Sequence, residues 1–300
     1  MLLFQRVKPS LAGELLPLLR GGQRLGCEYS FANLCMWGRN EYVKIQEYLV
    51  FFAHYDGKSV YTFPVGSGDI KVPLEAILED SRQRGIPCRI SGVTAQDRLV
   101  LERLYPGAFH FRACRDSGDY LYSVRDLATL PGRKYQQKRN HLNRFRAQYP
   151  DARLLPMTRE DFPRVRELLN TWYGSRQEEG EDYALEKRAL ERAMSHWDEL
   201  GLEGLCLYVE DRLRAFAVAS VLSDTVMDIH FEKADPEFPL GYAAINQGFA
   251  AFLLEKYPRL ELLNREDDMG IPGLRKAKLS YQPLQLLEKF RATWISEDER

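Results

Sequence analysis

The sequence predicts an α/β (α+β) protein made of two similar units, each with a mixed, mostly antiparallel sheet flanked by helices. Apolar residues recur at helical spacing in some segments and form short β-branched or aromatic runs in others. Both halves show the same order of elements: two helices, antiparallel strands, a helix, a strand, a helix and a strand. The 300 residues are 45% hydrophobic and 28% charged, which is typical of a globular chain and excludes a disordered or collagenous one.

Charge and composition exclude several kinds of partner and location. With 42 Lys+Arg against 43 Asp+Glu, the whole chain has no field that attracts nucleic acid or an anionic membrane, so only local patches can do so. No stretch approaches the ~18 apolar residues of a membrane-spanning helix. Arg6 and Lys8 follow the amino terminus directly and no secretory hydrophobic region comes after them, so we expect a cytoplasmic protein. The five cysteines contain no C-x-x-C pair and are typical of reduced core residues.

The first half opens with two helices and a hairpin. Leucines recur at helical spacing over residues 11–18, and a second helix is expected around residues 31–37. Aromatic and β-branched runs at residues 48–54 and 59–63 predict two strands. Asp56-Gly57 between them is typical of a two-residue turn, so the strands are expected to pair in antiparallel fashion.

Helices and strands then alternate. Pro73 precedes Leu74 and Ile77 and is expected in the first turn of a helix, where proline is favoured. Thr94 and Asp97 resemble a capping box at the start of the next helix. Short strands are expected at residues 88–90, 109–113 and 119–124.

The second half repeats this order. Thr158 is expected to cap one helix, and another ends near Leu200. A helix follows Gly241, a strand covers residues 260–263, and Pro272 opens the last helix. Before these come three strands of a meander, expected at residues 205–209, 213–222 and 225–231.

We therefore expect a first unit at residues 1–126, a basic linker helix at 127–157 and a second unit at 158–300 that carries the active cleft. Residues 132–146 hold six Lys/Arg and no acid, and their apolar residues share one helical stripe in which Arg139 also lies. Arg, Lys and amide donors in this number suit a phosphate group, whereas a solvated basic face is the alternative. The candidate anion contacts are Lys134, Lys138, Arg139, Asn140 and His141.

The turn at residues 235–243 is a second candidate anion site. Helix amino termini bind anions because their first N–H groups lack partners, and glycine lets a ligand approach closely. The candidate residues are Gly241, Tyr242 and Ala243. A plain connection between a strand and a helix is the alternative.

The segment after the strand at residues 260–263 is the third candidate, since ligands in open α/β sheets bind at such strand ends. Its acids could act as a general base or bind an amine, and a lysine and a tyrosine three residues apart on the next helix could reach the same place. A capped, salt-bridged helix start is the alternative. The candidate catalytic residues are Lys278, Tyr281, Glu266, Asp267 and Asp268. The candidate substrate-binding residues here are Asn264, Arg265 and Arg275.

Other polar residues favour structural interpretations. No metal site is expected, because the five histidines show no ligand spacing. His230 lies in a strand-like run and is interpreted as a satisfied core or cleft histidine. Asn246 falls on the apolar stripe of its helix, where a buried amide needs partners or a ligand.

Five stretches resemble a known family, namely Asp119 to Ser123, Gly132 to Tyr135, Lys138 to Phe145, Phe231 to Asp235 and Asn264 to Tyr281. They resemble uncharacterised bacterial proteins related to the carboxyl-terminal, catalytic domain of phosphatidylglycerol lysyltransferases. The resemblance covers nearly the whole chain.

The resemblance implies two GNAT-like units in tandem, the fold of coenzyme A-dependent N-acetyltransferases and of peptidoglycan aminoacyl transferases. Enzymes of this fold often use a tyrosine at the end of the last helix as general acid, and Tyr281 matches that place. Their Gln/Arg-x-x-Gly-x-Gly/Ala turn holds the pyrophosphate of coenzyme A. Gly241 and Ala243 match that turn, but Phe238 takes the basic or amide position, which weakens the case for coenzyme A.

Lysyltransferase relatives take an aminoacyl group from tRNA, and a basic helix suits such a donor. The expected function is transfer from aminoacyl-tRNA to a lipid or another hydroxyl or amine acceptor, with an anionic lipid reached from the inner face of the membrane. The alternatives are an acyl-CoA-dependent N-acyltransferase and a non-catalytic protein that binds RNA or anionic lipid. No tightly bound cofactor is expected, and the sequence predicts neither the acceptor nor the oligomeric state.

Overall fold

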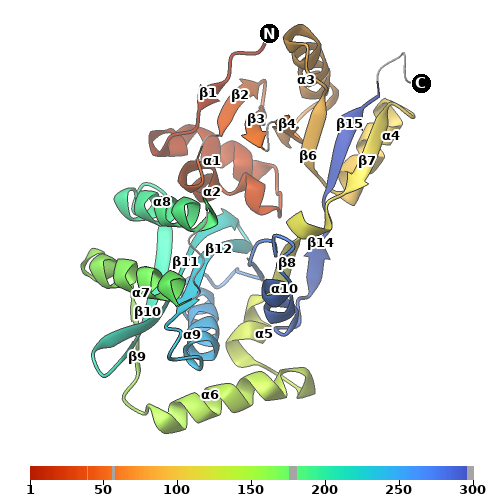
Figure 1. Ribbon diagram of the computed structural model, residues 1–300. Coiled ribbons are helices and arrows are strands. Elements are labelled where there is room, and N and C mark those ends of the chain that lie inside the picture. The colour runs from red at the N-terminus through yellow and green to blue at the C-terminus, as the bar shows by residue number, and fades with distance from the viewer. Residues whose placement is uncertain (39, 56–57, 176–180, 296–300) are drawn as a thin grey trace.

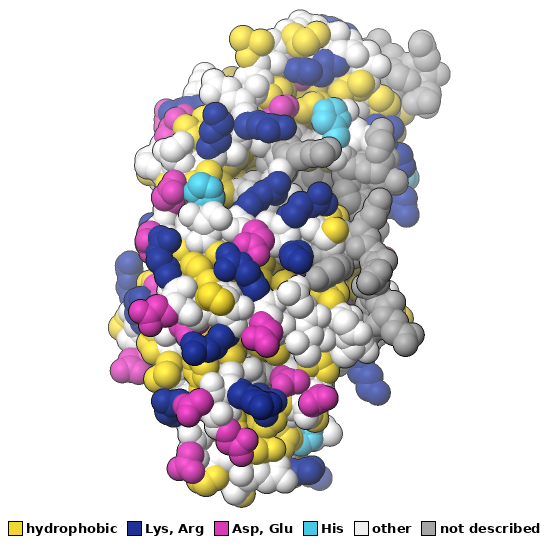
Figure 2. Space-filling view, turned by 60° about the vertical axis from the view of Figure 1, so that its left-hand side comes forward, with side chains coloured by type: hydrophobic (Ala, Val, Ile, Leu, Met, Phe, Trp, Pro, Cys, Tyr) yellow, Lys and Arg dark blue, Asp and Glu magenta, His cyan; other side chains and the backbone are white. Residues whose placement is uncertain are grey.

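The computed structural model describes residues 1–38, 40–55, 58–175 and 181–295, which form two sheets with helices packed around them (Figure 1). This arrangement confirms the predicted α/β fold class. Figure 2 shows a face on which Lys and Arg are interspersed with Asp and Glu, in agreement with the formal net charge of −1. None of the helices in the described part of the chain combines the length and the apolar character that crossing a bilayer requires.

The first sheet has the strand order β1-β2-β3-β4-β6-β15-β7, with β5 paired to β3. Its neighbours are antiparallel except for the parallel pair β4 and β6. The strands are β1 (Gln5–Arg6), β2 (Glu41–Ile45), β3 (Tyr48–Tyr55), β4 (Lys58–Thr62), β5 (Val65–Gly66), β6 (Arg89–Val93), β7 (Phe109–Ala113) and β15 (Phe290–Trp294). The helices of this half are η1 (Pro9–Leu11), α1 (Ala12–Gly21), η2 (Cys27–Tyr29), α2 (Phe31–Met36), α3 (Lys71–Arg84) and α4 (Ala95–Leu104).

The second sheet has the order β14-β8-β13-β12-β11-β10-β9, and only β12 and β13 are parallel neighbours. Its strands are β8 (Asp119–Ser123), β9 (Arg153–Pro156), β10 (Leu202–Val209), β11 (Arg212–Ser223), β12 (Val226–Ala234), β13 (Leu262–Asn264) and β14 (Gln285–Leu287). The remaining helices are η3 (Arg115–Ser117), α5 (Val124–Thr129), η4 (Arg133–Tyr135), α6 (Gln136–Gln148), η5 (Arg159–Asp161), α7 (Phe162–Gly174), α8 (Glu181–Ser195), α9 (Gly241–Lys256) and α10 (Pro272–Leu279).

The predicted elements are found within a few residues of their expected positions. The capping box of Thr94 with Asp97 is confirmed, and Thr158 forms one with Asp161 before α7. The turn predicted at residues 56–57 lies outside the described residues. The strands β1, β2, β5, β9, β14 and β15 and the helix α5 were not expected from the sequence.

Each sheet contains a strand from the other half of the chain. β8 ends the first half but lies between β14 and β13 in the second sheet. β15 comes last along the chain but lies between β6 and β7 in the first sheet (Figure 1). The sheets therefore do not divide the chain at residue 126, and the boundaries near residues 126 and 158 stay a prediction about domains.

Side chains alternate between the two faces of the second sheet. Phe216 and Val218 of β11 belong to a core shared with α1, α2, α7 and α8, whereas Ala215 and Ala217 belong to a core shared with α5, α6 and α9. We call these faces the α2 side and the α9 side. Near the end of β12, His230 contacts residues on the α2 side and Glu232 contacts residues on the α9 side. These two residues belong to the candidate site.

Candidate active site

The site lies where the parallel strands β12 and β13 separate. Their last paired residues are Asp228 and Asn264. His230 and Glu232 continue β12 beyond this pair, and Arg265 and Glu266 continue the chain after β13. His230 and Glu266 meet residues of the α2 side, while Glu232 and Arg265 meet residues of the α9 side. Groups on both faces of the sheet therefore lie around one opening between two strands.

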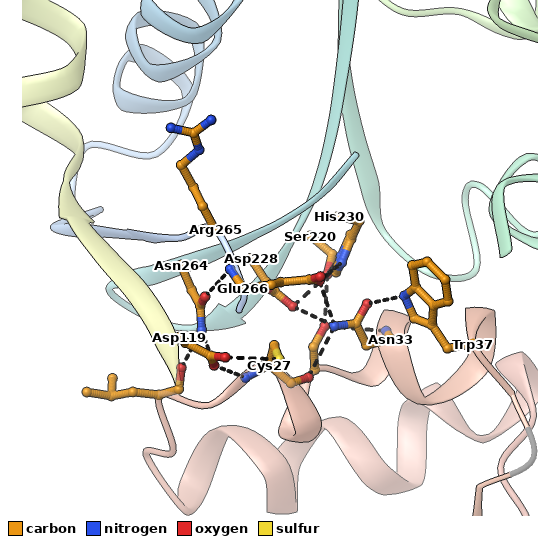
Figure 3. A network of polar contacts seen from close by, with 12 residues as sticks. Cys27, Asn33, Trp37, Asp119, Ser220, Asp228, His230, Asn264, Arg265 and Glu266 are labelled. Atoms are coloured by element: carbon orange, nitrogen blue, oxygen red, sulfur yellow. Dashed lines mark hydrogen bonds and ion pairs between the residues drawn. The ribbon is translucent and has the colours of Figure 1, made fainter. Parts of the chain in front are cut away.

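On the α2 side, Asn33 joins two carboxylates (Figure 3). Its Nδ2 donates to Glu266 Oε1 at 2.9 Å and to Asp228 Oδ2 at 3.2 Å. Trp37 Nε1 donates to Asn33 Oδ1 at 3.1 Å, which fixes the orientation of the amide. His230 is buried, with Nε2 2.8 Å from Ser220 Oγ and Nδ1 3.4 Å from Glu266 Oε1. The interpretation of His230 as a satisfied, buried histidine is confirmed.

A second set of contacts extends this network toward the first half of the chain. Asp119 Oδ2 accepts from the backbone N–H of Cys27 at 2.7 Å and from Asn264 Nδ2 at 2.9 Å. Lys289 Nζ lies 2.8 Å from Asp119 Oδ1 and 2.6 Å from Glu28 Oε2. Asn264, expected to bind substrate, is thus held by protein groups. We call the carboxylates of Glu28, Asp119, Asp228, Glu266 and Asp267 the acidic cluster.

The acidic cluster has more negative than positive charge. Lys289 is paired with Asp119 and Glu28, so it does not neutralise the other acids. Burial, and then the charge of Glu266, raise the pKa of Asp228 well above its usual value. Burial, followed by the charges of Asp119 and Glu266, raises the pKa of Asp267 to about 6. Such a cluster favours the uptake of a proton or of a cationic group.

Two groups of side chains in the described part of the chain have ligand atoms within 4.8 Å of one another, as a metal ion would require. In the first group, the ammonium of Lys289 lies against Glu28 and Asp119. In the second, the amide hydrogens of Asn33 are directed to Asp228 and Glu266, beside His230. Protein donors therefore occupy oxygens that a metal would use, and the expected absence of a metal site stays a prediction. The spacing of the histidines could not reveal that His230 and Glu266 meet.

On the α9 side, Glu232 joins Arg265 and Asn246. Its Oε1 accepts from Arg265 Nη2 at 2.8 Å, and its Oε2 accepts from Asn246 Nδ2 at 3.0 Å. The Arg265 guanidinium lies 4.9 Å from the centre of the Tyr281 ring. Lys138 Nζ lies 3.7 Å from the same centre and 2.7 Å from Ser280 Oγ. The fold thus brings Lys138 of the basic helix to Arg265 and Tyr281, which were singled out together in the segment from Asn264 to Tyr281.

Burial changes the ionisation of two members of this group. Burial, and then the charge of Glu232, raise the pKa of Tyr281 above its usual value, so its hydroxyl remains a proton donor. Burial and the neighbouring charge of Arg265 lower the pKa of Lys138 to about 8. The charge of Tyr242 also raises the pKa of Tyr281, so Tyr242 lies close enough to Tyr281 to affect its ionisation. Tyr242 accepts a hydrogen bond from Trp172 Nε1 at 2.7 Å.

Three other predicted residues take part in structural contacts. Asp268 is fully buried and accepts from Arg275 Nε at 2.9 Å, from Arg115 Nη1 at 3.1 Å and from Tyr120 at 2.5 Å. The bond with Arg275 is the main cause that lowers the pKa of Asp268. Lys278 Nζ donates to the backbone carbonyls of Arg265 and Asp267 and so holds the loop that carries Glu266. For Asp268 and Arg275, these contacts support the alternative interpretation, in which the two residues form salt bridges that hold the start of α10.

Inside the predicted linker helix at residues 127–157, η4 and α6 form a basic helix at the edge of the molecule beside α5 and α9 (Figure 1). The end of that predicted range is not helical, because Arg153–Pro156 form β9. Its stripe is buried at Tyr135, Leu142 and Phe145. Among the candidate anion contacts, Lys138 is the one that reaches Tyr281. Three of the others contact protein groups: Lys134 pairs with Asp126 at 3.0 Å, Arg139 donates to the carbonyls of Leu130 and Gly132, and Asn140 accepts from Gln136 at 2.9 Å. The fourth, His141, is exposed.

The turn before α9 is filled by its own side chains. A Cβ atom at Gly241 would lie 3.2 Å from both Ala234 Cβ and Phe238 Cδ1, so the glycine allows α9 to pack against β12. Arg214 pairs with Asp235 at 2.6 Å, and its guanidinium lies 5.4 Å from the centre of the Phe238 ring. These contacts support the alternative that the turn is a connection between β12 and α9.

Several residues of the site were not expected from the sequence. Asp119 and Glu232 lie in stretches that carried the family resemblance, which was the one signal that could have found them. Asn33, Ser220 and Lys289 belong to no motif and reach the site through the packing of distant segments. Asn246 was noted as a buried amide in need of a partner, and Glu232 is that partner.

Comparison with known proteins places the chain in a family. The family described as "Phosphatidylglycerol lysyltransferase, C-terminal" matches residues 20–293. An uncharacterised protein of Mycoplasmoides gallisepticum is 30% identical over 181 residues, which cover 58% of this chain and 55% of that protein. The match thus spans little more than half the length of this curated relative.

Solved structures agree with this assignment. A conserved protein of unknown function from Bacteroides thetaiotaomicron is 36% identical, with a TM-score of 0.92 over 98% of this chain and 100% of that one. L-PGS from Bacillus licheniformis is 15% identical, with a TM-score of 0.68 over 99% and 96% of the two chains. A C-terminal domain of a putative lysylphosphatidylglycerol synthetase from Agrobacterium fabrum is 13% identical, with a TM-score of 0.65 over 96% and 94%.

At these low identities the last two structures show the fold alone, and it agrees with the predicted α/β fold class. The family match covers nearly all of the sequence and rests on more than fold. This chain therefore belongs to the family of phosphatidylglycerol lysyltransferase C-terminal domains.

Proposed function

We propose that this chain transfers an aminoacyl group from aminoacyl-tRNA to a hydroxyl or amine acceptor, with an anionic lipid as one candidate. The observation that carries the proposal is the meeting of the basic helix α6 with Tyr281 beside the opening between β12 and β13. Lys138 of α6 lies over the Tyr281 ring at 3.7 Å, and Arg265 lies near the same ring at 4.9 Å. A donor whose phosphates bind along α6 would bring its aminoacyl end to these two side chains.

The two sides of the sheet suit two substrates. On the α9 side, Tyr281 would donate a proton to the oxygen that leaves the donor ester. On the α2 side, Glu266 and Asp267 would orient the acceptor and take the proton that it loses when its oxygen or nitrogen attacks the ester carbonyl. The new bond forms at the carbonyl carbon as the bond to the tRNA oxygen breaks. Positioning of the two substrates supplies much of the rate gain in such a reaction.

The first experiment measures binding and transfer with labelled aminoacyl-tRNA at about 0.15 M salt, using phosphatidylglycerol vesicles or a soluble amine as acceptor. Tyr281→Phe keeps the ring beneath Lys138 and removes the hydroxyl. It is expected to lower the transfer rate by roughly a hundredfold or more while donor affinity is retained. Tyr208→Phe is the control, because Tyr208 of β10 is likewise a buried tyrosine but bonds Asp161 at 2.5 Å.

Each result has a defined meaning. If the wild-type chain does not bind aminoacyl-tRNA, the proposal is wrong and acyl-CoA becomes the donor to test. Binding without transfer to any acceptor would favour the alternative of an RNA-binding protein on a transferase fold. Equal transfer by wild type and Tyr281→Phe would remove Tyr281 from the mechanism.

A further inference from the structure

The α9 side contains two buried polar atoms that no described group satisfies. Glu232 holds one end of Arg265 and one end of Asn246 through its two oxygens. The other ends, Arg265 Nη1 and Asn246 Oδ1, are buried and have no hydrogen-bond partner. Asn246 is only 4% exposed. A buried polar atom without a partner is unfavourable, so such a pair points to a ligand that supplies the missing bonds.

The two atoms define the chemistry of that ligand. Arg265 Nη1 offers a donor, and Asn246 Oδ1 offers an acceptor. The charge of Arg265 is balanced by Glu232, with side chains 13% and 11% exposed, so the pair does not select a free anion. The matching ligand is a carbonyl group with an N–H donor near it.

The location of the two atoms relates them to the proposed reaction. Figure 3 shows Arg265 directed away from the acidic cluster, toward α9. Its guanidinium lies 4.9 Å from the centre of the ring of Tyr281, the proposed proton donor. A carbonyl bound to Arg265 would therefore lie near Tyr281.

We infer that Arg265 and Asn246 bind the aminoacyl group itself, with Arg265 Nη1 donating to the ester carbonyl oxygen and Asn246 Oδ1 accepting from the α-ammonium. This inference rests on the proposed function and names the recognition element within it. Attack on the carbonyl carbon moves an electron pair onto the carbonyl oxygen, where the Arg265 N–H group stabilises the charge. This electron pair then re-forms the carbonyl double bond as the ester C–O bond breaks, and Tyr281 protonates the departing oxygen. Glu232 is a positioning residue that orients both side chains.

The test compares two stable probes by calorimetry on the full chain. One is adenosine carrying an aminoacyl group in amide linkage at its 3′ position, and the other lacks only the α-amino group. The wild-type chain is expected to bind the amino probe about tenfold more tightly, the effect of one hydrogen bond from a charged group. This comparison needs no variant, so it does not depend on whether a variant folds.

Variants then assign the two contacts. Asn246→Ala is expected to abolish the preference for the amino probe. Arg265→Lys keeps a charge beside Glu232 but removes the second guanidinium arm, so both probes should bind about tenfold more weakly with the preference retained. Arg24→Lys is the matched control, because Arg24 also pairs with a carboxylate, Asp97, at 2.7 Å. The two side chains are 19% and 6% exposed, and Arg24 lies in the first half of the chain. This variant should change neither affinity.

The outcomes separate this inference from the proposed function. Failure of the wild-type chain to bind aminoacyl-tRNA contradicts the proposed function. Binding of aminoacyl-tRNA with equal affinity for the two probes overturns only the inference. The pantetheine arm of coenzyme A also carries carbonyl and N–H groups. Tighter binding of acetyl-CoA than of the amino probe, lost in Asn246→Ala, would therefore assign the subsite to pantetheine and overturn the aminoacyl assignment.

Discussion

Asp267 is a carboxyl group whose ionisation is opposed by its surroundings. It follows Glu266 in a loop that Lys278 holds through two backbone carbonyls. Burial and two neighbouring acids raise its pKa to about 6, against an ordinary value of 3.8. The folded chain therefore holds a proton on Asp267 between about pH 4 and pH 6 that the unfolded chain releases. This side chain is consequently poised to exchange a proton near neutral pH.

We expect Asp267→Asn to be more stable than wild type at pH 7 but not at pH 4. A raised carboxyl pKa contributes stability that is present below the unfolded value and is lost as pH rises through the folded value. The difference in free energy of unfolding should grow by roughly 3 kcal/mol between pH 4 and pH 7, measured by urea unfolding at each pH. Asp224→Asn is the control, because Asp224 is exposed and 3.8 Å from Arg259. A constant difference across the pH range would contradict the assignment.

The residues of the site were predictable where chemistry is local in sequence. Glu266, Asp267 and Tyr281 follow a strand and a helix, and such positions can be recognised from periodicity and from a family pattern. Asn33 could not be recognised, because an asparagine inside a short apolar helix has no pattern of its own. Its importance comes from Asp228 and Glu266, which contact it from the other half of the chain.

Asp268 connects three elements of the fold. It accepts hydrogen bonds from Arg275 of α10, Arg115 of η3 and Tyr120 of β8. Since β8 lies between β14 and β13 in the second sheet and α10 carries Lys278, these bonds fix α10 and its loop to the sheet. The position of the site loop thus depends on a buried carboxylate that is not expected to touch substrate.

We expect Asp268→Asn to destabilise the fold without changing the chemistry. Removal of the charge weakens the hydrogen bonds that Arg115, Arg275 and Tyr120 make to this buried side chain, which costs about 2 kcal/mol in free energy of unfolding. The transfer rate per folded molecule should stay within about twofold of wild type, since structural losses act on the folded fraction. Asp116→Asn removes the exposed partner of Arg275, 66% exposed, and should cost less than about 1 kcal/mol. Denaturant unfolding and an activity titration distinguish these results. A large fall in rate with unchanged stability would restore a catalytic role for Asp268.

Helices and strands with clear periodicity could be predicted from the sequence, whereas strands that depend on their partners could not. All four residues of β9 are exposed, so no alternation marks it as a strand. β14 and β15 are three and five residues long. They pair with segments from distant parts of the chain, and periodicity carries no information about such pairing. The strand exchange was therefore beyond prediction from this sequence alone.

The exchange of β8 and β15 links the two halves of the chain through both sheets. Removal of the second half would leave the first sheet without β15, so β6 and β7 would have no strand between them. Removal of the first half would take β8 from between β13 and β14. Lys289, just before β15, also pairs with Asp119 at the start of β8. Neither half retains a complete sheet.

We expect fragments 1–126 and 127–300 to be unfolded when expressed separately. Each would expose strand edges and lose part of a buried core, and the remaining interactions cannot offset the conformational entropy of the chain. Circular dichroism during thermal unfolding and the dispersion of amide signals in NMR test this directly. The intact chain should unfold in one transition. A fragment that unfolds cooperatively on its own would show that its half is an independent domain.

The place of β15 also determines when the protein can fold during synthesis. β7 ends at Ala113, but its neighbour in the sheet begins only at Phe290. At the usual pace of translation, the ribosome needs roughly ten seconds or more to cover that distance. Throughout this interval the nascent chain presents β6 and β7 with unpaired backbone groups, which are sites where other chains can add as strands. The first sheet is therefore completed late in synthesis, and until then the edges of β6 and β7 are the places where aggregation can begin.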